Sequence, residues 1–195
     1  MVKTAEQLKF EYRDYKEPIH KIHRLVKEGL LFPLVKGVYE TDETANPFVL
    51  ARTICQPSYI SFETALSYYG LIPERVYSVI SASLNKDREK TYDNTFAHFI
   101  YKSIPERVYP YGVKLVRLDE RTSFQISTKE KELCDKLYKL PPLKNYYELA
   151  DLLYNDLRID EDGLLEFDLN DMKFYAINYR STNVDMLYRY LRRIK

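Results

Sequence analysis

The sequence predicts an α+β protein made of two parts. An N-terminal part, expected over residues 1–42, contains a helical pattern followed at once by two short β-prone runs. A larger part, expected over residues 43–195, contains strand-like segments with helical patterns before and after them. We expect this second part to hold a small, mostly antiparallel sheet and a helical C-terminal portion.

Composition and charge restrict the class of protein. The 195 residues are 45% hydrophobic, so the chain can bury a core, and a formal charge of +1 means that any site for a polyanion is local. Two cysteines are too few for a disulfide scaffold, and no uncharged stretch approaches the roughly 18 to 20 residues that span a bilayer. We therefore expect a cytoplasmic protein with no membrane partner.

The usual signatures of enzymes are missing from the sequence. The 5 glycines are dispersed, so there is no glycine-rich loop to close around a phosphate group. Neither a Gly-x-Ser-x-Gly elbow nor a His-Glu-x-x-His pair is present. The sequence therefore predicts a binding protein that is not an enzyme and needs no cofactor or metal.

An amphipathic helix is predicted to begin at Pro18 and to end at Gly29. Pro18 suits the first turn, and Gly29 suits the left-handed residue that ends a helix. Apolar side chains recur at spacings of three and four, at Ile19, Ile22, Val26 and Leu30. The opposite face is basic.

A hairpin is predicted directly after this helix, over residues 30–40, with Lys36 and Gly37 at its turn. A basic-faced helix followed by a hairpin with lysine at its tip is the order of a recognition helix and a wing, which contact the major groove and the phosphates of DNA. A surface helix with a solvated face, leading into an ordinary hairpin, is the plain alternative. The residues predicted to contact DNA in this part are Lys16, His20, Lys21, Arg24, Lys27 and Lys36.

Three blocks of sequence resemble one known family. Residues 22–39 are similar to the end of the winged helix in the AbiEi-type antitoxins, which are transcriptional regulators of bacterial type IV toxin-antitoxin systems. Residues 57–71, PSYISFETALSYYGL, are similar to the family's block PSYIS-x-x-SAL-x-x-x-GL. Residues 127–138, STKEKELCDKLY, are similar to its helix x-x-EKA-x-x-D-x-x-Y. The blocks occur in the family's order.

The resemblance implies an antitoxin active in phage defence, which represses its own promoter by binding double-stranded DNA and counteracts a nucleotidyltransferase-like toxin. It leaves open whether the toxin is contacted directly and whether the chain forms oligomers. Family members carry two helices before the recognition helix, whereas one helix, expected over residues 4–13, precedes it here. We therefore expect the first part to be a truncated winged helix-turn-helix, with the missing helix supplied by the C-terminal domain or by a second subunit. A protein–protein interaction module that has lost DNA binding is an alternative.

Local structure accounts for the two later blocks without catalysis. Ser61 is placed to cap a helix, with its hydroxyl accepting from the first turn. A second helix is expected to open at residue 127 or 128, and there Glu130, Lys131 and Asp135 are interpreted as exposed i,i+4 pairs. The segments predicted as strands are 75–82, 95–101, 113–118 and 122–127, with the charged loop 85–90 as a solvated turn.

A metal-dependent nuclease is the enzyme alternative, because a mixed sheet that bears carboxylates can hold Mg²⁺. No Glu-x-Lys falls inside a predicted strand, which disfavours this interpretation. His20 and His23 lie three residues apart on a helix, but no third ligand is near them in sequence. The carboxylates that the fold could bring together are Asp87, Asp119, Glu120 and Glu130.

The C-terminal portion divides by charge. Residues 144–171 carry nine acids and two bases, and a terminal helix over residues 183–195 is basic. In the acidic segment a helical apolar stripe is expected to be core: Tyr146, Leu149, Leu152, Leu153 and Leu157. Asp168 is expected to cap a helix whose apolar positions are Met172, Tyr175 and Ile177.

The basic terminal helix has two interpretations. Its cations could add contacts to the DNA backbone, with Arg189, Arg192 and Arg193 as the candidate residues. Alternatively, they form salt bridges with the acidic segment.

Overall fold

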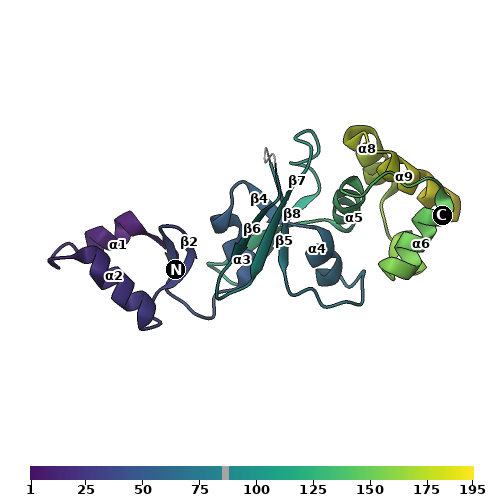
Figure 1. Cartoon of the computed structure of the whole chain (residues 1–195). Helices are drawn as coiled ribbons and strands as arrows, with labels where there is room; N and C mark the ends of the chain where they lie inside the picture. Colours follow the sequence, from purple (N-terminus) through teal and green to yellow (C-terminus); the bar gives the residue numbers. More distant parts are fainter. Residues whose placement is uncertain (85–87) are drawn as a thin grey trace.

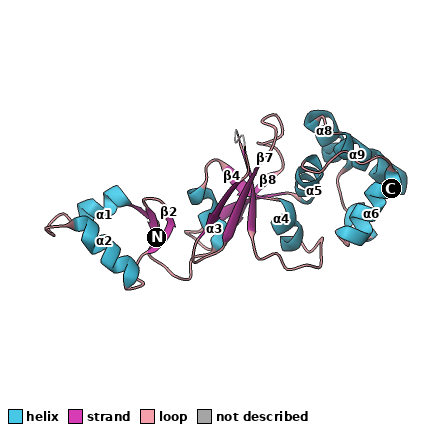
Figure 2. Cartoon of the chain, in the orientation of Figure 1, coloured by secondary structure: helices cyan, strands magenta, loops and turns pink. Residues whose placement is uncertain are grey.

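The computed structural model describes residues 1–84 and 88–195 and has the predicted α+β class. Its parts lie in a row (Figure 1), with α1 and α2 at one end, a sheet in the middle and the C-terminal helices at the other end. Figure 2 shows that the strands are concentrated in the middle of the molecule, with helices on both sides. The candidate DNA-binding helix is therefore at one tip of the molecule.

The N-terminal unit, residues 1–42, has a small sheet and two helices. Its elements are β1 (Lys3–Thr4), α1 (Ala5–Glu11), α2 (Pro18–Lys27), β2 (Phe32–Val35) and β3 (Val38–Glu40). β3 pairs antiparallel with both β1 and β2, which gives the order β1-β3-β2. The predicted helix and hairpin are both present, while β1 was not predicted, because two residues carry no detectable periodicity.

The N-terminal unit has a separate small core, formed by the buried side chains Leu8, Ile22, Leu25 and Leu31. Two members of the predicted apolar stripe are wrong, because Ile19 is 49% exposed and Leu30 is 57% exposed. Gly29 has a φ of +69°, so the chain leaves the helix there and the helical spacing no longer applies to Leu30. Ile19 lies in the first turn of α2, outside the small core formed by Leu8, Ile22, Leu25 and Leu31.

The larger part is built on a mixed sheet. In the described part of the chain six strands form it in the order β6-β7-β5-β4-β9-β8. The strands are β4 (Ser58–Ile60), β5 (Val79–Ser83), β6 (Lys90–Asp93), β7 (His98–Ser103), β8 (Val113–Arg117) and β9 (Ser123–Ser127). The four strands predicted from sequence correspond to β5, β7, β8 and β9.

The sheet is larger and less antiparallel than expected. β4 is parallel to β9 and β5 is parallel to β7, whereas the other pairings described are antiparallel. The sheet is larger because two strands were missed: β4 has only three residues, and β6 begins at Lys90, inside the segment expected to be a solvated turn. The parallel pairing of β5 with β7 joins two predicted strands, and it follows from a strand order that the sequence pattern does not display. Residues 85–87 of that segment, including Asp87, lie outside the described residues.

Helices cover both faces of the sheet. Side chains alternate along β5, so Val79 joins the cluster that contains Leu50 of α3 (Pro47–Ile54), while Ile80 and Ala82 join the opposite cluster. The opposite face carries α4 (Phe62–Tyr68) and α5 (Lys129–Tyr138). The two later blocks of sequence therefore lie on the same face of the sheet.

The C-terminal helices form a group that is attached to α5. They are α6 (Tyr146–Asp151), the π-helical segment η1 (Leu152–Asp156), α7 (Glu161–Leu165), α8 (Leu169–Tyr179) and α9 (Thr182–Ile194). α8 and α9 pack on α5, while α6 and α7 pack on α9. The predicted stripe is confirmed, because Leu149, Leu153 and Leu157 are buried in the main core. No helix in the described ranges is long and apolar enough to cross a membrane.

The predicted capping of α8 is confirmed, but one of its apolar positions is wrong. The Asp168 side chain accepts hydrogen bonds from the backbone N–H groups of Asn170 and Asp171. Met172 is buried, whereas Ile177 is 64% exposed. Tyr179 is buried instead, because it lies seven residues after Met172 on the face that meets α5.

Candidate nucleic-acid interface

α2 presents a face without acidic side chains at the tip of the molecule. Its ten residues, PIHKIHRLVK, include three cations and two histidines. Ile22 and Leu25 fix the helix on α1, so the residues between them point outward. A helix that enters a groove of DNA must present an exposed face that other parts of the protein do not cover, and α2 does so.

Four of the predicted DNA-contacting residues meet on one side of α2. A surface groove of about 300 Å³ runs along the start of the helix and the turn before it. The groove is lined by Tyr15, Lys16, Glu17, His20, Lys21 and Arg24. His20 and Arg24 are four residues apart on α2 and so lie on one face of the helix, while Lys16 lies before the helix, in the turn that leads into it.

Two of these side chains already have carboxylate partners. The Nδ1 atom of His20 lies 2.6 Å from a carboxylate oxygen of Glu17, and the Nε atom of Arg24 lies 3.4 Å from that of Glu28. All four side chains are at least 46% exposed. Exposed ion pairs contribute at most about 1 kcal/mol, so a phosphate group can replace either carboxylate at small cost.

Lys21 differs from its neighbours because its ammonium group is held over two aromatic rings. It lies 5.3 Å from the ring centre of Tyr15 and 6.0 Å from that of Tyr12. The rings themselves meet edge to face, with centres 5.9 Å apart. Neither tyrosine was predicted from the sequence to belong to the site, although their position just before a basic helix was a usable signal.

The two remaining residues of this unit lie outside the groove. Lys27 is exposed in the last turn of α2, and Lys36 is exposed at the turn of the hairpin. The carbonyl of Gly37, which has a φ of +78°, accepts a 2.8 Å hydrogen bond from the backbone N–H of Ala5. Lys36 therefore lies beside the start of α1.

The C-terminal arginines are not part of this surface. α9 lies at the opposite end of the molecule from α2 (Figure 1), so Arg189, Arg192 and Arg193 are not brought together with the residues of α2. The Arg189 guanidinium lies 2.8 Å from Asp185 of its own helix. Arg193 lies 4.4 Å from the ring centre of Tyr146.

The expected salt bridges between α9 and the acidic segment 144–171 are absent among the described residues. Contacts of another kind join them instead: the ring of Tyr146 under Arg193, and the carbonyl of Phe167, which accepts a hydrogen bond from Lys195. Acids of the segment pair elsewhere, as Glu166 does with Lys129 at 2.5 Å. Most of the acidic surface therefore faces solvent.

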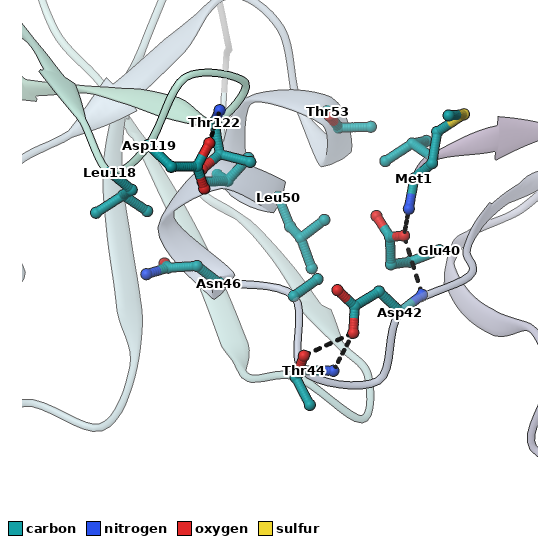
Figure 3. Close-up of a pocket in the computed structure, with 13 residues that line it drawn as sticks. Met1, Glu40, Asp42, Thr44, Asn46, Leu50, Thr53, Leu118, Asp119 and Thr122 are labelled. Atoms are coloured by element: carbon teal, nitrogen blue, oxygen red, sulfur yellow. Dashed lines mark hydrogen bonds and ion pairs between the residues drawn. The ribbon is translucent and has the colours of Figure 1, made fainter.

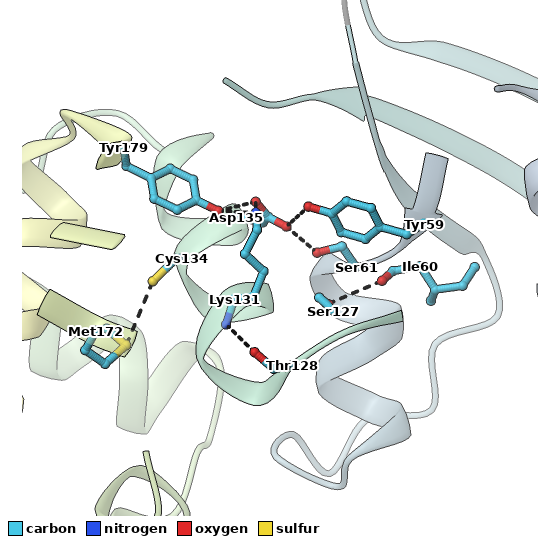
Figure 4. Close-up of polar contacts among 10 residues, drawn as sticks. All are labelled: Tyr59, Ile60, Ser61, Ser127, Thr128, Lys131, Cys134, Asp135, Met172 and Tyr179. Carbon is cyan, nitrogen blue, oxygen red and sulfur yellow. Dashed lines mark hydrogen bonds and ion pairs between the residues drawn. The ribbon is translucent and has the colours of Figure 1, made fainter. Parts of the chain in front are cut away.

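Two of the three charged residues interpreted as exposed pairs are buried, which overturns that interpretation, whereas the third, Glu130, is partly exposed. Lys131 and Asp135 have no exposed surface, and the Lys131 ammonium lies 2.6 Å from Asp135 Oδ1. Figure 4 shows Asp135 between two tyrosines, and Tyr179 donates to Oδ1 at 2.5 Å while Tyr59 donates to Oδ2 at 3.2 Å. The i,i+4 spacing was recognised correctly, but the spacing alone does not tell an exposed pair from a buried one.

Ser61 belongs to the same buried network, and its predicted role as a helix cap is wrong. It occupies the residue before α4, but its hydroxyl donates a 2.7 Å hydrogen bond to Asp135 Oδ2. The predicted cap of α5 is confirmed at Thr128, whose side chain accepts from the backbone N–H of Lys131. The network thus joins the second and third sequence blocks.

Glu132, the neighbour of Lys131, is a second buried charge carrier. Its side chain has 0% exposure, and neither carboxyl oxygen has a hydrogen-bond partner among the described residues. Burial is the main cause that raises its pKa to about 10, and the nearby charge of Asp135 adds to the effect. Glu132 is therefore protonated at neutral pH.

The described carboxylates of the nuclease alternative, those of Asp119, Glu120 and Glu130, do not converge, and Asp87 lies outside the described residues. Asp119 accepts hydrogen bonds from residues of its own turn between β8 and β9, and Glu120 is exposed in that turn. Glu130 is on α5, where it accepts from the backbone N–H of Asp168. Within residues 1–84 and 88–195 no group of three or more His, Cys, Asp or Glu side chains could hold a metal ion, and this includes His20 and His23.

Comparison with known proteins adds no assignment to this geometry. No protein-family model matches the sequence, and no curated protein matches it either.

Proposed function

We propose that this protein binds double-stranded DNA through α2 and the tip of the β2–β3 hairpin. The observation that carries the proposal is the groove at the start of α2, where Lys16, His20, Lys21 and Arg24 lie together on an exposed face. Cationic side chains at the N-terminal end of an exposed helix are suited to phosphates and to base edges in the major groove.

The topology of the N-terminal unit supports the same proposal. A strand, two helices and a hairpin follow one another, and the hairpin's second strand lies between the other two. We interpret this order as a winged helix-turn-helix that lacks its first helix, with α2 as the proposed recognition helix and the hairpin as the proposed wing. The core around Leu8 and Ile22 gives the shortened unit a means of holding α2 in place.

We further propose that the protein is a cytoplasmic antitoxin of a type IV toxin-antitoxin system and represses its own promoter. The support is the resemblance of three sequence blocks to the AbiEi-type antitoxins, together with the buried network that connects two of them. Because Ser61, Lys131 and Asp135 are fully buried, these blocks are suited to holding the fold together rather than to catalysis. A nucleotidyltransferase-like toxin is the proposed partner, and the proposed mode of action is binding without catalysis.

A mobility-shift titration with the DNA upstream of the protein's own gene tests DNA binding. The variants Lys16→Ala and Arg24→Ala each remove one proposed phosphate contact, and we expect each to weaken the shift about fivefold at physiological salt. Lys173→Ala is the matched control, because it removes an exposed cation from α8 at the other end of the molecule. If all three variants bind DNA with the affinity of the wild type, α2 does not read DNA.

Toxin neutralisation is tested separately by expressing the adjacent nucleotidyltransferase-like gene with and without this chain. Rescue of growth by both the wild type and Arg24→Ala is expected if neutralisation does not depend on DNA binding. Rescue without any DNA shift would identify an interaction module in place of a repressor. Failure to rescue growth contradicts the antitoxin proposal and leaves the DNA-binding proposal to its own test.

A further inference from the structure

The N-terminal unit is attached to the sheet on one side through its hairpin. Leu34 of β2 is 3% exposed and belongs to the core cluster beneath the sheet. Its carbonyl accepts a 3.3 Å hydrogen bond from the side chain of Asn94, and the rings of Phe32 and Phe96 meet with centres 5.9 Å apart. This side of the junction is closed and packed.

The other side of the junction is an open cavity of about 370 Å³ (Figure 3). Its lining comes from four places: the N-terminal unit, through Met1, Val2 and Glu40, the linker over residues 42–46, α3, and the turn between β8 and β9. The volume falls in the range of small-molecule sites, about 300 to 1,000 Å³. Any occupant would contact the N-terminal unit and the larger part at once.

The lining combines apolar side chains with an excess of carboxylates. Val49, Leu50 and Leu118 supply apolar surface. The carboxylates are those of Glu40, Asp42 and Asp119, and the one cationic group among the lining residues is the Met1 amine, which pairs with Glu40.

The two aspartates keep their charge and are oriented by their own turns. Asp42 accepts from the backbone and side chain of Thr44, and Asp119 accepts from Arg121 and Thr122. Hydrogen bonds from Thr44 and from Thr122 respectively are the main causes that lower the two pKa values below their usual range. Both carboxylates are exposed, so each retains lone pairs for a ligand.

We propose that this cavity binds a small organic cation with an apolar body, which bridges the N-terminal unit and the larger part. The carboxylates of Asp42 and Asp119, on different sides of the cavity, would attract the positive group, and the apolar body would lie against Val49 and Leu118. Because the hairpin contact at Leu34 is the packed side of the junction, an occupant on the open side fixes the angle of the N-terminal unit. The regulatory consequence, a changed DNA affinity, rests on the proposed function, whereas binding of the cation does not.

Binding is tested with three probes of similar size that differ in charge: 4-phenylbutylamine, 4-phenylbutanol and 4-phenylbutyrate. Titration followed by backbone NMR should show saturable shifts at residues of the linker and of α3 with the amine, and weaker or absent shifts with the other two. Absence of saturable shifts with the amine overturns the proposal. Equal binding of the amine and the carboxylate overturns the assigned charge class.

Isosteric variants test the site without removing its turns. In Asp42→Asn and Asp119→Asn the retained carbonyl oxygen can still accept from the backbone, and each change should weaken amine binding about 2- to 5-fold. Thr53→Phe, which adds bulk at the lining of the cavity, should abolish binding with little change in melting temperature. Asp156→Asn is the control, since it removes an exposed acid from the distant segment η1. Binding that survives Thr53→Phe, or that Asp156→Asn weakens as much as Asp119→Asn does, contradicts the site.

The regulatory step is measured as DNA affinity of the wild type with and without saturating amine, with Thr53→Phe as control. A change seen in the wild type and missing in Thr53→Phe supports coupling through the junction. Equal affinity with and without the amine overturns the coupling. If the amine binds but no DNA is bound under any condition, the proposed function fails while the cation site stands.

Discussion

The ammonium group of Lys131 lies 2.6 Å from Asp135 Oδ1, and neither side chain has any exposed surface. Aromatic rings surround the cation, with the ring centre of Tyr179 at 4.9 Å and that of Tyr59 at 5.6 Å. Burial lowers the pKa of Lys131, and the charge of Asp135 opposes this effect. Both residues are on α5, and Asp135 accepts hydrogen bonds from Tyr59 of β4 and Tyr179 of α8. The pair therefore connects the sheet to the C-terminal helices.

Breaking this pair should destabilise the whole larger part. Asp135→Asn leaves a buried ammonium group without its counter-charge, and we expect a loss of about 3 to 5 kcal/mol in the free energy of unfolding. Lys131→Met leaves the carboxylate of Asp135 buried without its counter-charge. The double variant Lys131→Met, Asp135→Asn removes both charges, keeps an acceptor for the hydroxyls that donate to Asp135, and should lose less than the sum of the two single variants. Urea denaturation followed by circular dichroism measures all three. A double variant as unstable as the sum of the single variants would show that the pair is not coupled.

DNA binding should be salt-dependent, and its slope should report the contacts of the N-terminal unit. Lys21→Ala and Lys36→Ala each remove one proposed phosphate contact, so each should reduce the slope of log K against log salt by about 0.9. Arg192→Ala, a control at the opposite end of the molecule, should leave the slope unchanged. If neither Lys21→Ala nor Lys36→Ala changes affinity or slope, the N-terminal unit is not the DNA reader.

The C-terminal helix should contribute to stability and not to DNA binding. Truncation after Leu187 removes Leu191, which is fully buried, and the contact of Arg193 with the ring of Tyr146. We expect a lower melting temperature, with DNA affinity retained at temperatures where the truncated chain is folded. Arg193→Ala alone should cost about 0.5 to 1 kcal/mol, the contribution of an exposed cation–π contact. Reduced DNA affinity at an unchanged melting temperature would contradict this assignment.

Periodic segments were the part of the fold that could be predicted from the sequence. α2, the strands β5, β7, β8 and β9 and the stripe of Leu149 and Leu153 all have enough residues to display a period. The hairpin was predicted from the turn at Lys36 and Gly37 between two β-prone runs, since β2 and β3 are themselves short. β1, β4 and β6 are two to four residues long, and their existence depends on pairing with distant strands. The mixed topology of the sheet could not be predicted because register and strand order are tertiary properties.

The candidate site was predictable to the extent that it lies on one helix. His20 and Arg24 share a face because of helical spacing alone, which the sequence displays, whereas the position of Lys16 depends on the turn before Pro18. The rings of Tyr12 and Tyr15 under Lys21 depend on how the preceding turn folds back. Burial of Lys131 could not be predicted, because a lysine and an aspartate four residues apart are exposed in most helices.

Glu132 should make the protein less stable as the pH rises. Its folded-state pKa is raised from 4.5 to about 10, chiefly by burial, so the native protein keeps a proton that the unfolded chain loses above its own pKa. The stabilising contribution of this proton is complete below the unfolded-state pKa and is lost as the pH rises toward the folded-state value. Between about pH 5 and pH 9 this single group should lower the free energy of unfolding by up to about 1.4 kcal/mol per pH unit.

Glu132→Gln removes the titration while keeping the shape of the side chain, so its free energy of unfolding should depend less on pH than that of the wild type. The difference in free energy of unfolding between the two proteins should grow from acidic to alkaline pH. Only the wild type must either hold a proton on Glu132 or bury its ionised carboxylate. Urea titrations at a series of pH values measure the difference, with Glu120→Gln as the control at an exposed glutamate. Parallel pH profiles of the wild type and Glu132→Gln would mean that Glu132 ionises normally in the folded protein, with hydrogen-bond partners for its two carboxyl oxygens.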